Sequence, residues 1–252
     1  ILSIAKGMEI FSLRNKRDNF VGVNQPNNIL FAAGLYYLSD YAASAYILAN
    51  LYEVGNYERE IDKFVLCSLK RKLDEQNPYC KLLNEYLTTG DEEFIQELLQ
   101  RIEARKTIAY KHNPYEFSIC FLAESILKKF KTNNIWSDLL KHNNYDHWRP
   151  YIDKTIKKSF PVWDFFPSQK TALEKGILNS LQSIALQTPT SSGKTAICEL
   201  LIYNEHKNNP NCKILYLAPF RALAAELRKS FGRNLSRLGI SSKTIYGGNI
   251  PT

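Results

Sequence analysis

The sequence lacks the cysteine and histidine patterns that would hold a disulfide framework or a metal ion. Its five cysteines are scattered, and none forms a C-x-x-C pair, which excludes a zinc knuckle and a disulfide-stapled fold. Its four histidines show no metal-ligand spacing, so we expect ordinary surface or core residues. This cysteine usage fits a reducing, cytoplasmic setting.

A targeting segment and a clear membrane span are also lacking. No basic region precedes an apolar one at the N-terminus, and because the chain begins at Ile1 rather than Met we expect it to be trimmed there. Residues 29–52 carry few charges and allow a membrane span as one reading, but Asp40 and other polar residues interrupt them. Two buried helices joined near residues 39–40 explain the segment better, and no membrane contact is expected.

Acidic residues are scarce in the C-terminal part of the chain. Residues 152–252 contain 14 Lys and Arg against 6 Asp and Glu, a balance of +8, whereas residues 1–151 hold 19 of each. This excess favours a polyanionic partner such as nucleic acid, with a solvated basic surface as the alternative. The length of 252 residues and the 44% hydrophobic content allow two domains with cores of their own.

Residues 1–150 have the apolar periodicity of helices separated by short polar breaks, which predicts an all-α helical module. Gly90-Asp91 precedes a segment with acids in its first turn and bases near its end, as the helix dipole favours. Residues 33–52 are similar to one helix–turn–helix unit of a tetratricopeptide repeat. No second copy follows at a fixed period, so a single hairpin in an irregular helical domain is the better interpretation.

Residues 151–252 have a different pattern, in which predicted strands alternate with predicted helices. The strands are expected at 184–187, 213–218 and 243–246, and the helices at 168–179, from 196 to about 203, and at 221–235. This alternation predicts right-handed crossovers and a parallel sheet that binds ligands at the C-terminal ends of its strands. The predicted fold class is therefore α + α/β, a helical module followed by a parallel-sheet domain.

A phosphate-binding loop is predicted between the first of these strands and the helix after it. The candidate nucleotide-binding residues are Thr188, Pro189, Thr190, Ser191, Ser192, Gly193, Lys194, Thr195 and Ala196. Lys194 is expected to reach the β- and γ-phosphates, and the Thr195 hydroxyl is expected to bind Mg²⁺. The positive end of the following helix dipole would face the same charge. Thr188 stands where the strict loop pattern has its first glycine.

Upstream of the loop, Phe166-Pro167-Ser168-Gln169 offers an aromatic ring and a carboxamide. The ring suits stacking, and the amide can donate and accept at the edge of adenine. This aromatic-Pro-x-Gln arrangement ahead of a helix, with Lys194 25 positions after Gln169, is the one called the Q-motif in superfamily-two helicases.

The downstream segment resembles motif Ia of the same superfamily. It reads Pro219, Phe220, Arg221 and Ala222 at the start of a helix, and Gly247-Gly248 follows the last predicted strand. The resemblance implies that the Arg221 turn grips a phosphodiester backbone without regard to sequence. The two glycines would allow a second close approach to that backbone, although a plain turn explains them equally well.

Together these blocks, over about residues 163–252, resemble the N-terminal RecA-like domain of DExH helicases. The amino-acid sequence of the loop most resembles the branch of archaeal repair helicases and exosome- or spliceosome-associated RNA helicases. The helical module ahead of such a domain is also similar to bacterial antiphage helicases, such as the helicase subunit of the Hachiman system, which works beside a nuclease.

The resemblance implies the N-terminal part of a helicase or translocase that uses ATP and Mg²⁺ on DNA or RNA. Lys194 and Thr195 would carry the catalytic roles. The chain ends at Thr252, before the Asp-Glu-x-His/Asp segment of the family, so we expect this piece not to hydrolyse ATP efficiently by itself. In the alternative interpretation residues 1–150 mainly dock a partner protein, such as a defence nuclease, and the ATP domain is regulatory.

Overall fold

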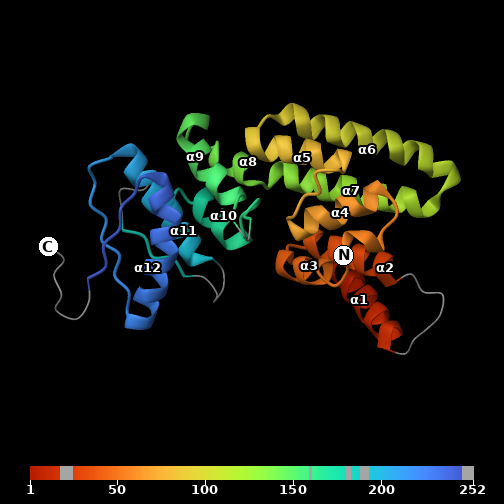
Figure 1. The fold of residues 1–252 in the computed structure, drawn as a ribbon, viewed down its shortest axis with the longest axis horizontal. Helices are drawn as coiled ribbons and strands as arrows, with labels where there is room; N and C mark the ends of the chain where they lie inside the picture. Colours follow the sequence, from red (N-terminus) through yellow and green to blue (C-terminus); the bar gives the residue numbers. More distant parts are fainter. Residues whose placement is uncertain (18–24, 159–160, 180–182, 188–192, 246–252) are drawn as a thin grey trace. The chain divides into compact units, whose positions relative to one another are not determined.

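The structure is a computed structural model that describes residues 1–17, 25–158, 161–179, 183–187 and 193–245. The chain divides into two compact units, the first called here the helical unit (1–137 with 159–164) and the second called the second unit (138–158 with 165–252) (Figure 1). The chain thus enters the second unit, returns to the helical unit near residue 160, and leaves it again. The division expected at residues 150–151 falls inside α9 (Tyr145–Ile156).

Helices make up the helical unit. They are α1 (Leu2–Arg17), α2 (Gln25–Leu38), α3 (Ala42–Ala49), the 3₁₀ turn η1 (Val54–Asn56), α4 (Glu60–Lys70), α5 (Pro78–Thr89), α6 (Glu92–His112) and α7 (Pro114–Thr132). The short α8 (Ile135–Leu139) spans the first crossing to the second unit. The longest two, α6 and α7, run side by side (Figure 1).

Capping side chains start three of these helices. Asn77 accepts hydrogen bonds from two backbone amides at the start of α5. Asp91 accepts from the Glu93 amide at 2.9 Å, and Asn113 accepts from the Glu116 amide at 3.0 Å. Such caps satisfy backbone donors that have no partner inside the helix. The predicted placement of a helix after residues 90–91, with acids in its first turn, is confirmed by α6.

The segment 29–52 forms α2 and α3, joined by a turn in which Asp40 has a φ of 68°. This confirms the interpretation as two helices. Gly34 lets α2 approach α7 closely, because an added Cβ would lie 2.8 Å from a Leu122 methyl carbon. Among the described ranges, no helix is both long and apolar enough to cross a bilayer.

The returning segment 161–164 is held in the helical unit by Arg71, which ends α4 in a left-handed conformation. The Arg71 guanidinium donates to the Asp164 carboxylate and to the Pro161 carbonyl. The Trp163 carbonyl accepts from the Ile135 amide at 2.8 Å. These contacts anchor the chain directly before it enters the second unit at Phe165.

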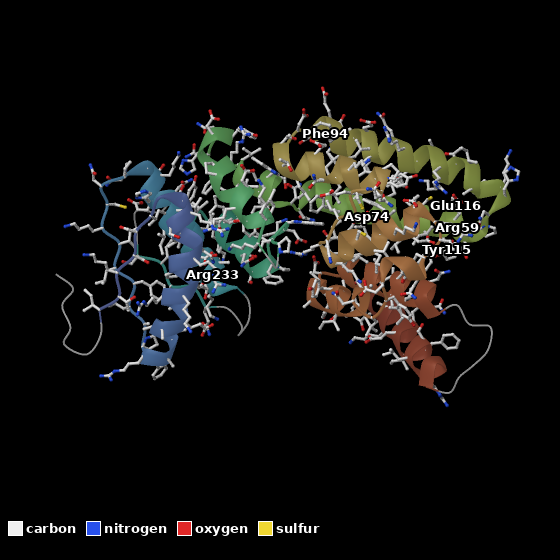
Figure 2. The ribbon with its side chains drawn as sticks, viewed as in Figure 1. Arg59, Asp74, Phe94, Tyr115, Glu116 and Arg233 are labelled. Carbon is white, nitrogen blue, oxygen red and sulfur yellow. The ribbon has the colours of Figure 1, made fainter. Side chains whose placement is uncertain are left out.

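A buried carboxylate lies near the start of α4. Asp62 is 2% exposed, its Oδ1 has no hydrogen-bond partner among the described residues, and its Oδ2 lies 3.8 Å from Arg59. The Arg59 guanidinium lies over the Tyr115 ring, and Figure 2 shows both beside Glu116. Burial raises the pKa of Asp62 to about 6, although Arg59 opposes this shift.

Replacing Asp62 by asparagine is expected to raise the free energy of unfolding by about 1–3 kcal/mol near pH 7.5. The folded protein binds more protons than the unfolded chain between the ordinary pKa of 3.8 and about 6. Wild-type stability therefore falls as the pH rises through this window, whereas the neutral amide is insensitive to it. The gain should vanish near pH 4 in chemical denaturation. A gain that is the same at both pH values would contradict the assignment. Glu97→Gln, at a half-exposed carboxylate of α6, serves as control.

The second unit contains α9, α10 (Pro167–Glu174), α11 (Lys194–Asn208), α12 (Arg221–Leu235) and the 3₁₀ turn η2 (Ser236–Leu238). Tyr203 and Asn204 of α11 face α9: the Tyr203 hydroxyl donates to the His147 carbonyl, and the Asn204 amide oxygen lies 3.0 Å from the His147 ring nitrogen. On its other side, α11 contacts α12 through an apolar cluster. The cluster centres on Leu227, Phe231 and Leu235, with Cys198 and Ile202 packed against it.

The prediction of a RecA-like parallel sheet is wrong, because the described residues contain helices and no strand. The predicted strands at 184–187, 213–218 and 243–245 are non-helical, and residue 246 lies outside the described residues. Tyr216 packs on Phe231 and Ala218 on the same cluster, but Leu215 and Leu217 are 79% and 80% exposed. A parallel strand is covered on both faces and bonded to neighbouring strands. The predicted strands therefore keep their alternating pattern of apolar side chains, but among the described residues they lack the hydrogen bonds to neighbouring strands that would form a sheet.

Candidate nucleotide and nucleic-acid site

The described end of the predicted phosphate loop is Gly193, which caps the N-terminus of α11 in a left-handed conformation with φ of 76°. Its carbonyl accepts from the amides of Ala196 at 3.0 Å and Ile197 at 3.3 Å. Lys194, the first residue of α11, is exposed, and Thr195 is partly buried. Thr188, Pro189, Thr190, Ser191 and Ser192 lie outside the described residues. The helix thus begins where the sequence places the phosphate-binding lysine.

Gln169 contacts this loop end directly. Its side chain is 4% exposed, its Oε1 accepts from the Phe166 amide at 2.9 Å, and its Nε2 donates to the Gly193 carbonyl at 3.0 Å. An added Cβ at Gly193 would lie 2.2 Å from that Nε2. The structure therefore brings Phe166, Gln169 and Gly193 together across 24 positions of sequence. In this arrangement both ends of the carboxamide are engaged by the protein.

The Phe166 ring is 40% exposed and stands at the N-cap of α10. It is also near Gly193, since its Cδ2 would lie 3.5 Å from a Cβ built there. A partly exposed aromatic ring can stack on a planar base through an open face. This position suits the stacking role expected from the sequence.

The predicted nucleic-acid turn lies at the start of α12. Phe220 precedes the helix and is 72% exposed, and its carbonyl accepts from the Ala224 amide at 3.0 Å. Pro219, Arg221 and Ala222 are exposed as well. Gly247 and Gly248 lie outside the described residues. A helix N-terminus with an exposed arginine attracts a phosphate anion through its amides and its dipole.

One residue at the centre of this unit was not singled out from the sequence. Glu199 of α11 is 4% exposed, and its carboxylate contacts Lys158, Ser230 and Asn234. The sequence does contain a clue to Glu199, because this acidic residue stands between Ile197 and Leu200, which are both buried in the same helix. A buried acid in an apolar stretch needs partners, but the sequence does not say which.

Lysines cluster beside this carboxylate. Burial, together with the neighbouring charge of Lys158, lowers the pKa of Lys154 to about 8, while Glu199 opposes the shift. The charge of Lys154, near the end of α9, therefore depends on its burial and on the charges of Lys158 and Glu199.

The chain is similar to a helicase family model and to a Hachiman protein. Residues 166–251 match the family model described as DEAD/DEAH box helicase. The chain is 25% identical over 245 residues to the Hachiman protein HamB of Bacillus cereus, which covers 85% of this chain and 22% of that protein. This second similarity includes the helical unit.

Other relatives match a smaller share of the chain. The ATP-dependent DNA helicase Hel308 of Methanocaldococcus jannaschii is 36% identical over 95 residues, covering 35% of this chain and 8% of that protein. Activating signal cointegrator 1 complex subunit 3 of Dictyostelium discoideum is 39% identical over 77 residues, covering 27% of this chain and 4% of that protein. These similarities confirm the resemblance to superfamily-two helicases and to the Hachiman protein. The chain spans less than a quarter of the length of these curated relatives.

Proposed function

We propose that this chain is the ATP–Mg²⁺-binding and strand-contacting part of a superfamily-two helicase or translocase. The observation that carries the proposal is the hydrogen bond from Gln169 to the Gly193 carbonyl. It joins an aromatic-flanked glutamine to the end of the predicted phosphate loop within a helicase-family match. Neither feature is specific alone, and their contact supports a shared nucleotide site.

The residues present fit a bound nucleotide. Gly193 leaves no room for a Cβ and starts a helix whose first residue is an exposed lysine. Lys194 would hold the β- and γ-phosphates, Thr195 would contribute a hydroxyl ligand to Mg²⁺, and Phe166 would stack on the base. The bound metal would supply charge neutralisation at the phosphates. Gln169 would read adenine only by exchanging its contact with Phe166 or Gly193 for one to the base.

The bound nucleic-acid strand would lie at the start of α12. Arg221 and the first amides of that helix would contact backbone phosphates, which gives binding without sequence preference. Residues 152–252 contain 14 basic and 6 acidic residues, and this excess of positive charge supports a polyanionic partner.

The test is ATP hydrolysis by the full-length protein, with and without single-stranded oligonucleotides. Lys194→Ala is expected to lower the strand-stimulated rate at least about tenfold, because it removes a charge from the phosphates. The exposed Lys207→Ala, later in the same helix, is the matched control and should retain the rate. An unchanged rate in Lys194→Ala would refute the assignment.

A second candidate function is protein docking by the helical unit. Exposed Ile108 and Tyr110 of α6, with Phe121 of α7, support it: their exposed fractions are 72%, 68% and 58%. Exposed apolar side chains of this kind are common in protein interfaces. Docking of a partner protein would survive Lys194→Ala, so the same variant separates the two functions.

A further inference from the structure

Glu199 is a buried carboxylate whose partners come from two other parts of the second unit. Its Oε2 lies 3.1 Å from the Lys158 Nζ, just after α9. Its Oε1 accepts from the Ser230 hydroxyl at 3.1 Å and from the Asn234 amide at 2.6 Å, both on α12. The carboxylate therefore connects α11 to α12 and to the segment that follows α9.

These contacts fix the register of α11 against α12. Ser230 and Asn234 are one turn apart on the same face of α12. The two helices also meet at the apolar cluster of α12, which packs against Cys198 and Ile202. Apolar contacts tolerate small shifts, whereas a buried charge is costly unless its hydrogen-bond partners stay in place. A shift of one helix along the other would thus break the Glu199 contacts first.

The two helices begin at the two phosphate positions of the proposed function. Lys194 starts α11 five positions before Glu199, and Arg221 starts α12 nine positions before Ser230. The first helix would meet the nucleotide phosphates and the second would meet the strand. A rigid connection between them would let occupancy of one position bias the other.

We propose that Glu199 is a positioning residue that couples nucleotide binding at the start of α11 to strand binding at the start of α12. The inference rests on the proposed function and adds to it the residue through which the two ligands affect one another. Glu199 is 4% exposed, so it would act through the two helices rather than by contacting a ligand.

The experiment measures coupling in the full-length protein. A fluorescent non-hydrolysable ATP analogue with Mg²⁺ is titrated with and without a single-stranded oligothymidine, and the ratio of the two dissociation constants is the coupling factor. We expect about tenfold for the wild type. Glu199→Gln should bring the factor close to one while each affinity measured alone changes less than about threefold.

Tyr203→Phe is the matched control, because it removes a buried hydrogen bond that α11 makes to α9 rather than to α12. It should keep the wild-type coupling factor. Should Glu199→Gln fail to fold, Asn234→Ala removes one α12 partner and leaves the carboxylate with Ser230 and Lys158. That variant should lower the factor in the same direction.

An unchanged coupling factor in folded Glu199→Gln, or in Asn234→Ala where Glu199→Gln does not fold, overturns the inference. So does an equal loss in Tyr203→Phe, which would indicate general destabilisation. A wild-type protein that binds both ligands without coupling also overturns it and leaves the proposed function standing. A wild-type protein that binds neither ligand overturns the proposed function itself.

Discussion

Replacing Gly193 by alanine is expected to lower the affinity of the full-length protein for ATP–Mg²⁺ about a hundredfold. A residue other than glycine in the left-handed conformation costs about 1–2 kcal/mol, and Gly193 has a φ of 76°. The new Cβ would also lie 2.2 Å from the Gln169 Nε2, which displaces a hydrogen bond worth about 1 kcal/mol. The two costs add to about 2–3 kcal/mol, and since 1.4 kcal/mol corresponds to about tenfold, the upper end gives about a hundredfold.

The matched control is Gly176→Ala. Gly176 has a φ of 77°, but nothing lies within 4 Å of a Cβ built there. It should therefore lose some stability to backbone strain and keep its nucleotide affinity. Combining Gly193→Ala with Gln169→Ala should leave the backbone strain and remove the clash. Retained ATP affinity in Gly193→Ala, or an equal loss in Gly176→Ala, would contradict the assignment of Gly193 to the loop.

Local features of the second unit could be predicted from the sequence where a single residue decides the backbone. Gly193 before a lysine and Pro219-Phe220 before an arginine mark the starts of α11 and α12. Both helices begin within two residues of the expected positions, because capping and chain reversal depend on neighbouring residues.

Contacts between distant segments could not be predicted in this way. The hydrogen bond from Gln169 to Gly193 joins residues 24 positions apart and was not expected from the sequence, while the adenine contact of Gln169 stays a prediction. Glu199 was missed because Lys158 and Asn234 are 41 and 35 positions away from it. The sheet was wrongly predicted for the same reason: a strand such as 213–218 exists only where a neighbour pairs with it.

A triple substitution on α12 is expected to weaken strand binding strongly. Arg228, Lys229 and Arg233 are exposed on this helix, and Figure 2 shows Arg233 there. Replacing all three by alanine should lower the affinity for a single strand about a hundredfold at low salt, because each cation neutralises a phosphate and releases counterions.

Salt dependence distinguishes phosphate contacts from a general change in charge. On a plot of log affinity against log salt, each lost phosphate contact reduces the slope by about 0.7 for a single strand, so three contacts reduce it by about 2. The control replaces Lys72, Lys81 and Lys111, exposed lysines of the helical unit, with the same loss of charge. It should keep the wild-type slope if the strand follows α12 from Arg221. Equal slopes for the two triple variants would mean that the strand responds to net charge alone, and the basic face of α12 would then be a solvated surface rather than part of the binding track.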